Sequence, residues 1–109
     1  MMNEVIAISP GDQSYVTHEW AVLLFESPWC GGCKDVLKIM ERFPLDTGVD
    51  CFWGRVDITQ NQVLAQQYGV MSLPTVIIFH QGIPRERFSG TMSEGAFVQK
   101  VKKYIEHVP

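Results

Sequence analysis

Two cysteines three positions apart, Cys30 and Cys33, are the residues whose type and spacing point most directly to chemistry. They follow an apolar run at 21–25 that indicates a buried strand, and they open a segment with helical spacing. Unpaired N–H groups at a helix start carry roughly half a positive charge, which favours the thiolate that attacks a disulfide. The pattern therefore predicts reversible thiol–disulfide exchange at a strand-to-helix turn.

Short apolar runs separated by turn signals indicate the elements that must position this pair. Strands are expected at 4–8, 20–26, 51–57, 75–80 and 86–89, and helices at 12–17, at 33–43, from Thr59 or Asn61 to Tyr68, and from Ser93 to Ile105. The predicted order is β-α-β-α-β-α-β-β-α. It is typical of an α/β fold whose central sheet is parallel in part, ends in a hairpin and carries helices on both faces.

Length and composition limit which other classes of function the chain could have. The chain of 109 residues predicts one domain over 1–109, and its net charge of −3 gives no electrostatic reason to bind nucleic acid. No signal-peptide pattern and no run of about 20 apolar residues is present, so we expect a cytoplasmic monomer without membrane contact. Three cysteines are too few for a disulfide scaffold or for a metal site within one chain, although two copies could share a metal through their cysteine pairs. Cys51 is then a buried core residue or a regulatory thiol.

Over nearly its whole length the chain resembles the thioredoxin family. The matching pieces, in family order and spacing, are Trp-Cys-Gly-Gly-Cys-Lys at 29–34, Tyr-Gly-Val at 68–70, Leu-Pro-Thr at 73–75, Phe-His-Gln-Gly at 79–82 and Ser-Gly at 89–90. The resemblance implies the thioredoxin fold, a central mixed sheet flanked by helices. It also implies a cis peptide bond before Pro74, with this proline lying against the Cys30 sulfur.

Thiol chemistry and the resemblance together imply a protein-disulfide reductase. Cys30, exposed at the helix start, would attack a substrate disulfide, and Cys33, facing the core, would resolve the mixed disulfide. The implied partners are protein disulfides and a thioredoxin-reductase-type flavoprotein or another dithiol donor, and no bound cofactor or metal is needed. The implied substrate surface consists of Trp29, Gly31, Gly32, Ile58, Ser72, Leu73, Gly90 and Thr91. A core role for Ile58 and a turn role for Thr91 remain open.

Two departures from the family pattern bear on the chemistry. The family usually has a proline at the position of Gly32. Glycine there is expected to make the dithiol turn less rigid, at a cost of about 1 kcal/mol in the free energy of the folded turn. The direction of the redox reaction therefore stays open. The family's buried acid, six residues before the first cysteine, is replaced by Leu24. Glu26 lies on the same side of the strand by alternation. Glu26 either exchanges a proton with Cys33 through a water, with Arg55 as its ionic partner, or is a solvated carboxylate at the end of the strand.

Two alternative functions follow from these departures. A disulfide oxidant or isomerase would need a very acidic Cys30 thiol and an unstable disulfide. A binding or adaptor module with a weakly active pair is favoured only by the missing buried acid. Retention of both cysteines together with Trp29 and Pro74 argues against the adaptor, because an adaptor has no physical need for all four.

Overall fold

The computed structural model describes residues 2–45 and 48–105, and its elements follow the predicted order, with a 3₁₀ helix as the first helical element. In chain order they are β1 (Ile6–Ala7), η1 (Ser14–Thr17), β2 (Trp20–Glu26), α1 (Gly31–Glu41), β3 (Cys51–Asp57), α2 (Gln62–Gln67), β4 (Thr75–His80), β5 (Ile83–Ser89) and α3 (Glu94–Ile105). The predicted domain over 1–109 also includes residues 1, 46–47 and 106–109, which lie outside the described residues.

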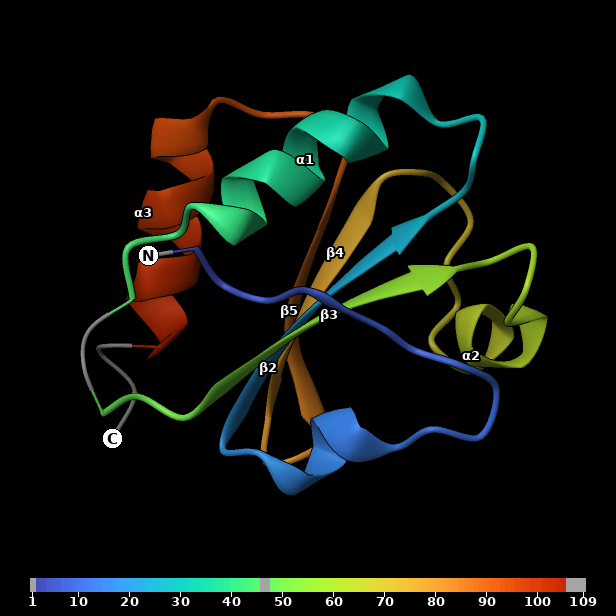
Figure 1. Ribbon diagram of the computed structural model, residues 1–109, viewed down its shortest axis with the longest axis horizontal. Helices are drawn as coiled ribbons and strands as arrows, with labels where there is room; N and C mark the ends of the chain where they lie inside the picture. Colours follow the sequence, from blue (N-terminus) through green and yellow to red (C-terminus); the bar gives the residue numbers. More distant parts are fainter. Residues whose placement is uncertain (1, 46–47, 106–109) are drawn as a thin grey trace.

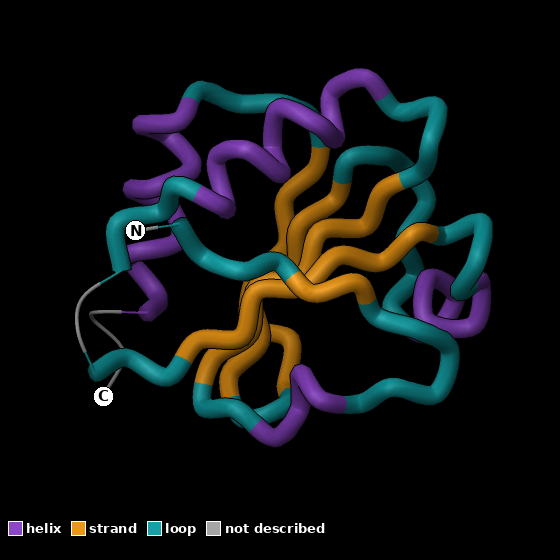
Figure 2. Tube along the Cα trace, in the orientation of Figure 1, coloured by secondary structure: helices purple, strands orange, loops and turns teal. Residues whose placement is uncertain are grey.

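The five strands form one mixed sheet in the order β1-β3-β2-β4-β5 (Figure 2). Strands β1 and β2 both pair in parallel with β3, whereas β4 runs antiparallel to β2 and to β5. The prediction of a partly parallel sheet that ends in a hairpin is therefore confirmed. Because β2 and β3 run in the same direction, the segments that follow them emerge at the same end of the sheet.

Two hydrophobic clusters fill the spaces on either face of this sheet. Helices α1 and α3 cover one face, and α2 and η1 lie on the other (Figure 1). Successive side chains of a strand point to opposite faces, so β2 contributes to both clusters. Trp20, Val22 and Leu24 belong to the first cluster, and Ala21, Leu23 and Phe25 belong to the second. Burial on both faces explains why β2 is a continuous apolar run rather than an alternating one.

The hairpin strand β5 begins at Ile83, three residues before its predicted start at position 86. Gln81 and Gly82 both have positive φ angles, 52° and 81°, which is the backbone of a tight two-residue hairpin turn. The strand can therefore begin directly after Gly82. Residues 83–85 are all exposed, so no apolar alternation indicated them.

Other boundaries differ at the ends of elements. Helix α1 begins at Gly31 rather than at position 33, because the two glycines are helical but give no apolar signal. Strand β1 is limited to two residues at the sheet edge, where 4–8 was expected. The expected helix at 12–17 is shortened to η1, although the Asp12 carboxylate accepts a hydrogen bond from the Ser14 N–H over 2.9 Å.

Of the two capping residues considered for α2, Asn61 is the one used. Its Oδ1 accepts a hydrogen bond from the Leu64 N–H over 3.2 Å. Thr59 is instead held by the Asp57 carboxylate, which accepts from its hydroxyl over 2.6 Å. Gly69, just after the helix, has a φ of +64°, as its position predicted.

Candidate active site

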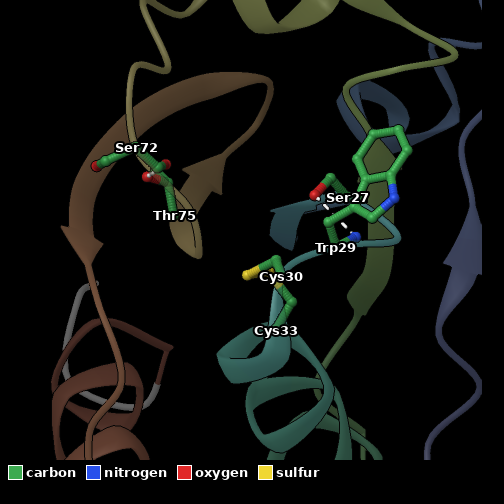
Figure 3. Close-up of a disulfide and its surroundings, with 6 residues drawn as sticks. All are labelled: Ser27, Trp29, Cys30, Cys33, Ser72 and Thr75. Carbon is green, nitrogen blue, oxygen red and sulfur yellow. Dashed lines mark hydrogen bonds between the residues drawn. A yellow bond between two sulfur atoms is a disulfide. The ribbon is translucent and has the colours of Figure 1, made fainter.

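The two cysteines of the predicted redox pair lie at the start of α1 and are joined by a disulfide (Figure 3). The Sγ–Sγ distance is 2.19 Å and the Cα–Cα distance is 5.4 Å. Cys30 is the N-cap residue and is half-buried, whereas Cys33, inside the first turn, is 1% exposed. Cys33 faces the core as expected, whereas Cys30 is more accessible than Cys33 but half-buried rather than exposed.

The helix start surrounds Cys30 with partial positive charge. The first backbone N–H groups of α1 have no partner within the helix, and no acidic residue lies in its first turn. Together with the helix dipole, these groups stabilise a thiolate more than a thiol, so they lower the cost of ionising Cys30 once the disulfide is reduced.

The loop that ends at Pro74 lies beside the cysteine pair. The Leu73–Pro74 peptide bond is cis, as the resemblance implied. The Thr75 hydroxyl donates to the carbonyl of Ser72 over 2.6 Å, and the N–H of Gly90 donates to the carbonyl of Pro74 over 2.9 Å. In Figure 3, Ser72 and Thr75 lie on one side of Cys30, whereas the Trp29 side chain extends away on the other.

Trp29 and Gly32 differ sharply in the space around them. Trp29 is 82% exposed, which leaves a large apolar side chain on the surface at the residue just before Cys30. At Gly32 an added Cβ would lie 2.6 Å from the Thr91 Cγ2 and 3.7 Å from the Pro74 Cδ. Thr91 therefore occupies the space that a side chain at position 32 would need. Three separate segments meet at this turn because residue 32 has no side chain.

Leu24, at the position of the family's buried acid, is fully buried in the cluster under α1 and α3. Glu26 lies on the same side of β2, as alternation predicted. It lines a cleft of about 690 Å³ together with Cys33, and its Oε2 is 3.8 Å from the Nε of Arg55, the expected ionic partner. The Glu26 side chain is 17% exposed, so its carboxylate is partly buried and paired.

Burial raises the pKa of the Glu26 carboxyl above its usual range, against the opposing effect of the Arg55 charge. The charge of Asp57 raises this pKa further. Such a carboxyl exchanges its proton closer to neutral pH than an ordinary glutamate does.

Asp57 also contributes to this site, although it was not among the residues predicted from the sequence. It lies beside Glu26 because these residues end the two parallel strands in register. Each is the last residue of a predicted strand, and this shared position was the only signal in the sequence.

A second missed residue is Arg87, whose guanidinium donates to the carbonyl of Tyr68 and, over 3.3 Å, to that of Gly69. These bonds hold the end of α2, from which the chain continues to Pro74. No pattern within β5 pointed to this contact.

The family model described as Thioredoxin matches residues 12–103. The chain belongs to the thioredoxin family. Among this family, the thioredoxin of Bacillus subtilis is 34% identical over 97 residues, which cover 86% of this chain and 93% of that protein. A chloroplastic M-type thioredoxin from Pisum sativum is 30% identical over 105 residues, covering 94% of this chain and 60% of that protein.

Solved thioredoxins share the architecture. A mutant thioredoxin from Halobacterium salinarum superposes with a TM-score of 0.83 at 27% identity, covering 97% of this chain and 95% of that one. The thioredoxin of Malassezia sympodialis gives a TM-score of 0.75 at 26% identity, with coverages of 94% and 89%. The mixed five-stranded sheet with its flanking helices is therefore the thioredoxin fold.

Family membership and the disulfide-bonded pair together establish this thioredoxin-family chain as a thiol–disulfide oxidoreductase of the protein-disulfide reductase type. Among the described residues, no helix is both long and apolar enough to cross a membrane. Over the same residues, no three His, Cys, Asp or Glu side chains are grouped so that they could hold a metal ion.

Proposed function

We propose that the Cys-Gly-Gly-Cys turn is the active site for reduction of protein disulfides, with Cys30 as the nucleophile and Cys33 as the resolving thiol. The observation that carries this assignment is the difference in access at one helix end. Cys30 is half-buried next to unpaired N–H groups, whereas Cys33 is 1% exposed. A disulfide in another protein can therefore reach Cys30, while Cys33 reacts only with a sulfur already attached to the turn.

The reaction consists of two exchanges. The Cys30 thiolate attacks one substrate sulfur, and the other substrate sulfur leaves as a thiolate that takes up a proton. Cys33 then loses its proton and attacks the Cys30 sulfur, so the bond between Cys30 and the substrate breaks and the second substrate thiol is released. Two electrons pass to the substrate, and the disulfide between Cys30 and Cys33 forms. No bound cofactor is required, because the two thiols hold both electrons.

The substrate would lie as an extended segment across Trp29, Gly31, Leu73 and Gly90, the surface around the pair. Exposed Trp29 would supply apolar contact, and backbone groups beside Pro74 would pair with the segment. At Gly31 an added Cβ would meet nothing within 4 Å, so the side of the turn at Gly31 is open to a substrate. The proposal is supported by Figure 3, in which Trp29 lies on one side of Cys30 and Ser72, next to Leu73 in sequence, lies on the other.

The dithiol would be regenerated by a thioredoxin-reductase-type flavoprotein or another dithiol donor. Support comes from a Mycobacterium leprae relative named bifunctional thioredoxin reductase/thioredoxin, 26% identical over 77% of this chain and 18% of that protein. We place the protein in the cytoplasm, where thiols are kept reduced.

The reduction potential of the cysteine pair tests this function. We expect a value below about −240 mV, in the range of disulfide reductases, because the partial charges of a helix start stabilise the Cys30 thiolate only moderately. The measurement is equilibration with graded thiol buffers followed by trapping of free thiols. A value above about −200 mV would instead assign the pair to oxidation or isomerisation.

Within this mechanism, we propose that Glu26 accepts the Cys33 proton, through a water in the cleft that both residues line. A proton acceptor must be ionised, and the raised pKa of Glu26 places its ionisation nearer neutral pH than that of an ordinary carboxyl. The resolving step should therefore slow as the pH falls through this raised pKa. The positive charge of Arg55 opposes this rise in the pKa.

Glu26→Gln is expected to slow resolution on the order of a hundredfold at neutral pH and to remove this inflection from the pH profile. The measurement is the rate at which Cys33 releases thionitrobenzoate from a mixed disulfide preformed on Cys30. Glu41→Gln is the matched control, since Glu41 lines the same cleft. An unchanged profile in Glu26→Gln would exclude Glu26 from proton transfer.

A further inference from the structure

An exposed side chain of β5, Arg87, bonds to the end of α2. Its guanidinium donates to the carbonyl of Tyr68, the C-cap residue, and over 3.3 Å to the carbonyl of Gly69. Arg87 lies opposite Ile77 of β4, which belongs to the hydrophobic cluster on the α2 side of the sheet. The last carbonyls of a helix have no partner inside it and carry partial negative charge. A cation that donates two hydrogen bonds complements them.

Two other contacts hold this point of the chain, and neither uses the same carbonyls. The N–H of Val70 donates back into the helix over 2.9 Å, which closes the end of α2 on itself. The ring of Tyr68 packs against that of Phe79, with 5.1 Å between their centroids. Both contacts leave the Tyr68 and Gly69 carbonyls to Arg87. The direction in which the chain leaves α2 therefore depends on this side chain.

The chain that leaves α2 is the short loop 70–73, and it ends at Pro74 beside the dithiol turn. The Cδ of Pro74 lies 3.7 Å from the position that a Cβ at Gly32 would take. The N–H of Gly90, just after β5, donates to the carbonyl of Pro74 over 2.9 Å. Both ends of the loop are thus attached to the same part of the chain, by Arg87 at one end and by Gly90 at the other. A shift at the Arg87 end is transmitted through four residues to the backbone beside Pro74.

We propose that Arg87 is a positioning residue for substrate binding. By fixing the carbonyls of Tyr68 and Gly69, it holds the backbone beside Pro74 where it can pair with an extended substrate segment. This inference rests on the proposed reduction at Cys30, because that backbone matters only if a substrate lies across it. Arg87 acts through the loop and not on the thiols. A loop that is already in place loses less conformational entropy when the substrate binds, so binding is tighter.

Two mixed disulfides with thionitrobenzoate measure the contribution of the peptide backbone. One is made with N-acetylcysteine amide, and the other with a twelve-residue peptide of Ser, Thr and Gly that has one central cysteine. The ratio of their second-order rates of thionitrobenzoate release, peptide over amide, gives the advantage of a peptide. We expect a ratio of about 10 in the unchanged protein and of about 2 in Arg87→Met, which removes the donors but keeps an unbranched side chain.

Two further variants distinguish the hydrogen bonds from the charge. Arg85→Met is the matched control, since it removes the same charge from another exposed position of β5, where the arginine acts on Tyr104 of α3. Its ratio should stay near that of the unchanged protein. Arg87→Lys keeps a donor that can reach one of the two carbonyls, so it should recover part of the lost ratio. The reduction potential of the cysteine pair should be the same in all of these proteins, because the dithiol turn keeps its surroundings.

Amide exchange tests the link between Arg87 and the loop. Exchange at the N–H groups of Gly69 and Val70 should be at least fivefold faster in Arg87→Met, because the end of α2 opens more often without its attachment to β5. Exchange at Ile77, within β4, should not change. Equal exchange at Gly69 and Val70 in the two proteins would show that the loop does not depend on Arg87, and it would overturn the inference.

The outcomes separate this inference from the proposed function. If the unchanged protein releases thionitrobenzoate from neither compound, the proposed reduction at Cys30 is wrong. If it reacts with both but shows no advantage for the peptide, or if Arg87→Met keeps the ratio within twofold, only the role of Arg87 is overturned. The same holds if Arg85→Met lowers the ratio equally, because net charge would then be the cause. It also holds if Arg87→Met slows both compounds equally, because the change would then lie in the dithiol.

Discussion

Cys30→Ser is expected to lower the rate of protein-disulfide reduction on the order of 10⁴-fold, to the level of the uncatalysed exchange. A serine hydroxyl does not ionise near neutral pH, so the partial positive charge at the start of α1 has no thiolate to stabilise. Cys33 cannot take over, because it is 1% exposed and a protein disulfide cannot approach it. The measurement is reduction of a protein disulfide by the prereduced variant in a single turnover.

Cys33→Ser distinguishes the role of Cys33 from that of Cys30, because the two single variants are expected to give different products. This variant should form the mixed disulfide at Cys30 at nearly the normal rate and then stop, so the covalent complex with the substrate accumulates and is seen by mass spectrometry. Cys51→Ser is the control: the chain's third cysteine is free and partly buried, burial raises the pKa of its thiol, and its loss should change neither step. Continued turnover in Cys33→Ser, or a trapped complex in Cys30→Ser, would contradict the assigned roles.

Phe97→Ala is expected to lower the free energy of unfolding by about 3–5 kcal/mol. Phe97 lies in α3 with its side chain fully buried against the sheet. Its ring centroid is 5.6 Å from that of Phe88 in β5 and 6.2 Å from that of Phe43 after α1. Truncation would leave a cavity where the helix layer meets the sheet, and this structure cannot collapse around it without separating those contacts.

Urea unfolding monitored by circular dichroism measures the effect, with Gln99→Ala as a matched control. Gln99 is an exposed residue of the same helix, and its replacement should change stability by less than about 0.5 kcal/mol. Because Phe97 does not line the active site, activity per folded molecule should be retained at low temperature. A decrease of less than about 1 kcal/mol in the free energy of unfolding would show that the packing of Phe97 against the sheet contributes little to stability.

Local sequence was enough to predict the elements that carry the active site. The apolar run of β2, the Cys30–Cys33 spacing and the helical periodicity that follows were each readable within a few residues. The capping role of Asn61 and the positive φ of Gly69 could also be predicted, because both features depend on a residue and its immediate neighbours. Alternation along β2 also predicted the side on which Glu26 lies. These features concern one segment at a time.

Features that join separate segments were not readable in this way. The start of β5 at Ile83 was missed because its first residues are exposed, and the parallel register that sets Asp57 beside Glu26 leaves no local pattern. The absence of room for a side chain at Gly32 depends on the Thr91 methyl group, which belongs to a loop far away in sequence.

The sequence by itself therefore determined which residues react, since the type, spacing and helix position of the two cysteines are local properties. The tertiary structure decided their surroundings: the partly buried Glu26 with Arg55 and Asp57, and the packed turn at Gly32. The physical reason is that burial, charge–charge distances and close packing arise only where segments distant in sequence meet, and sheet register and helix packing set those meetings.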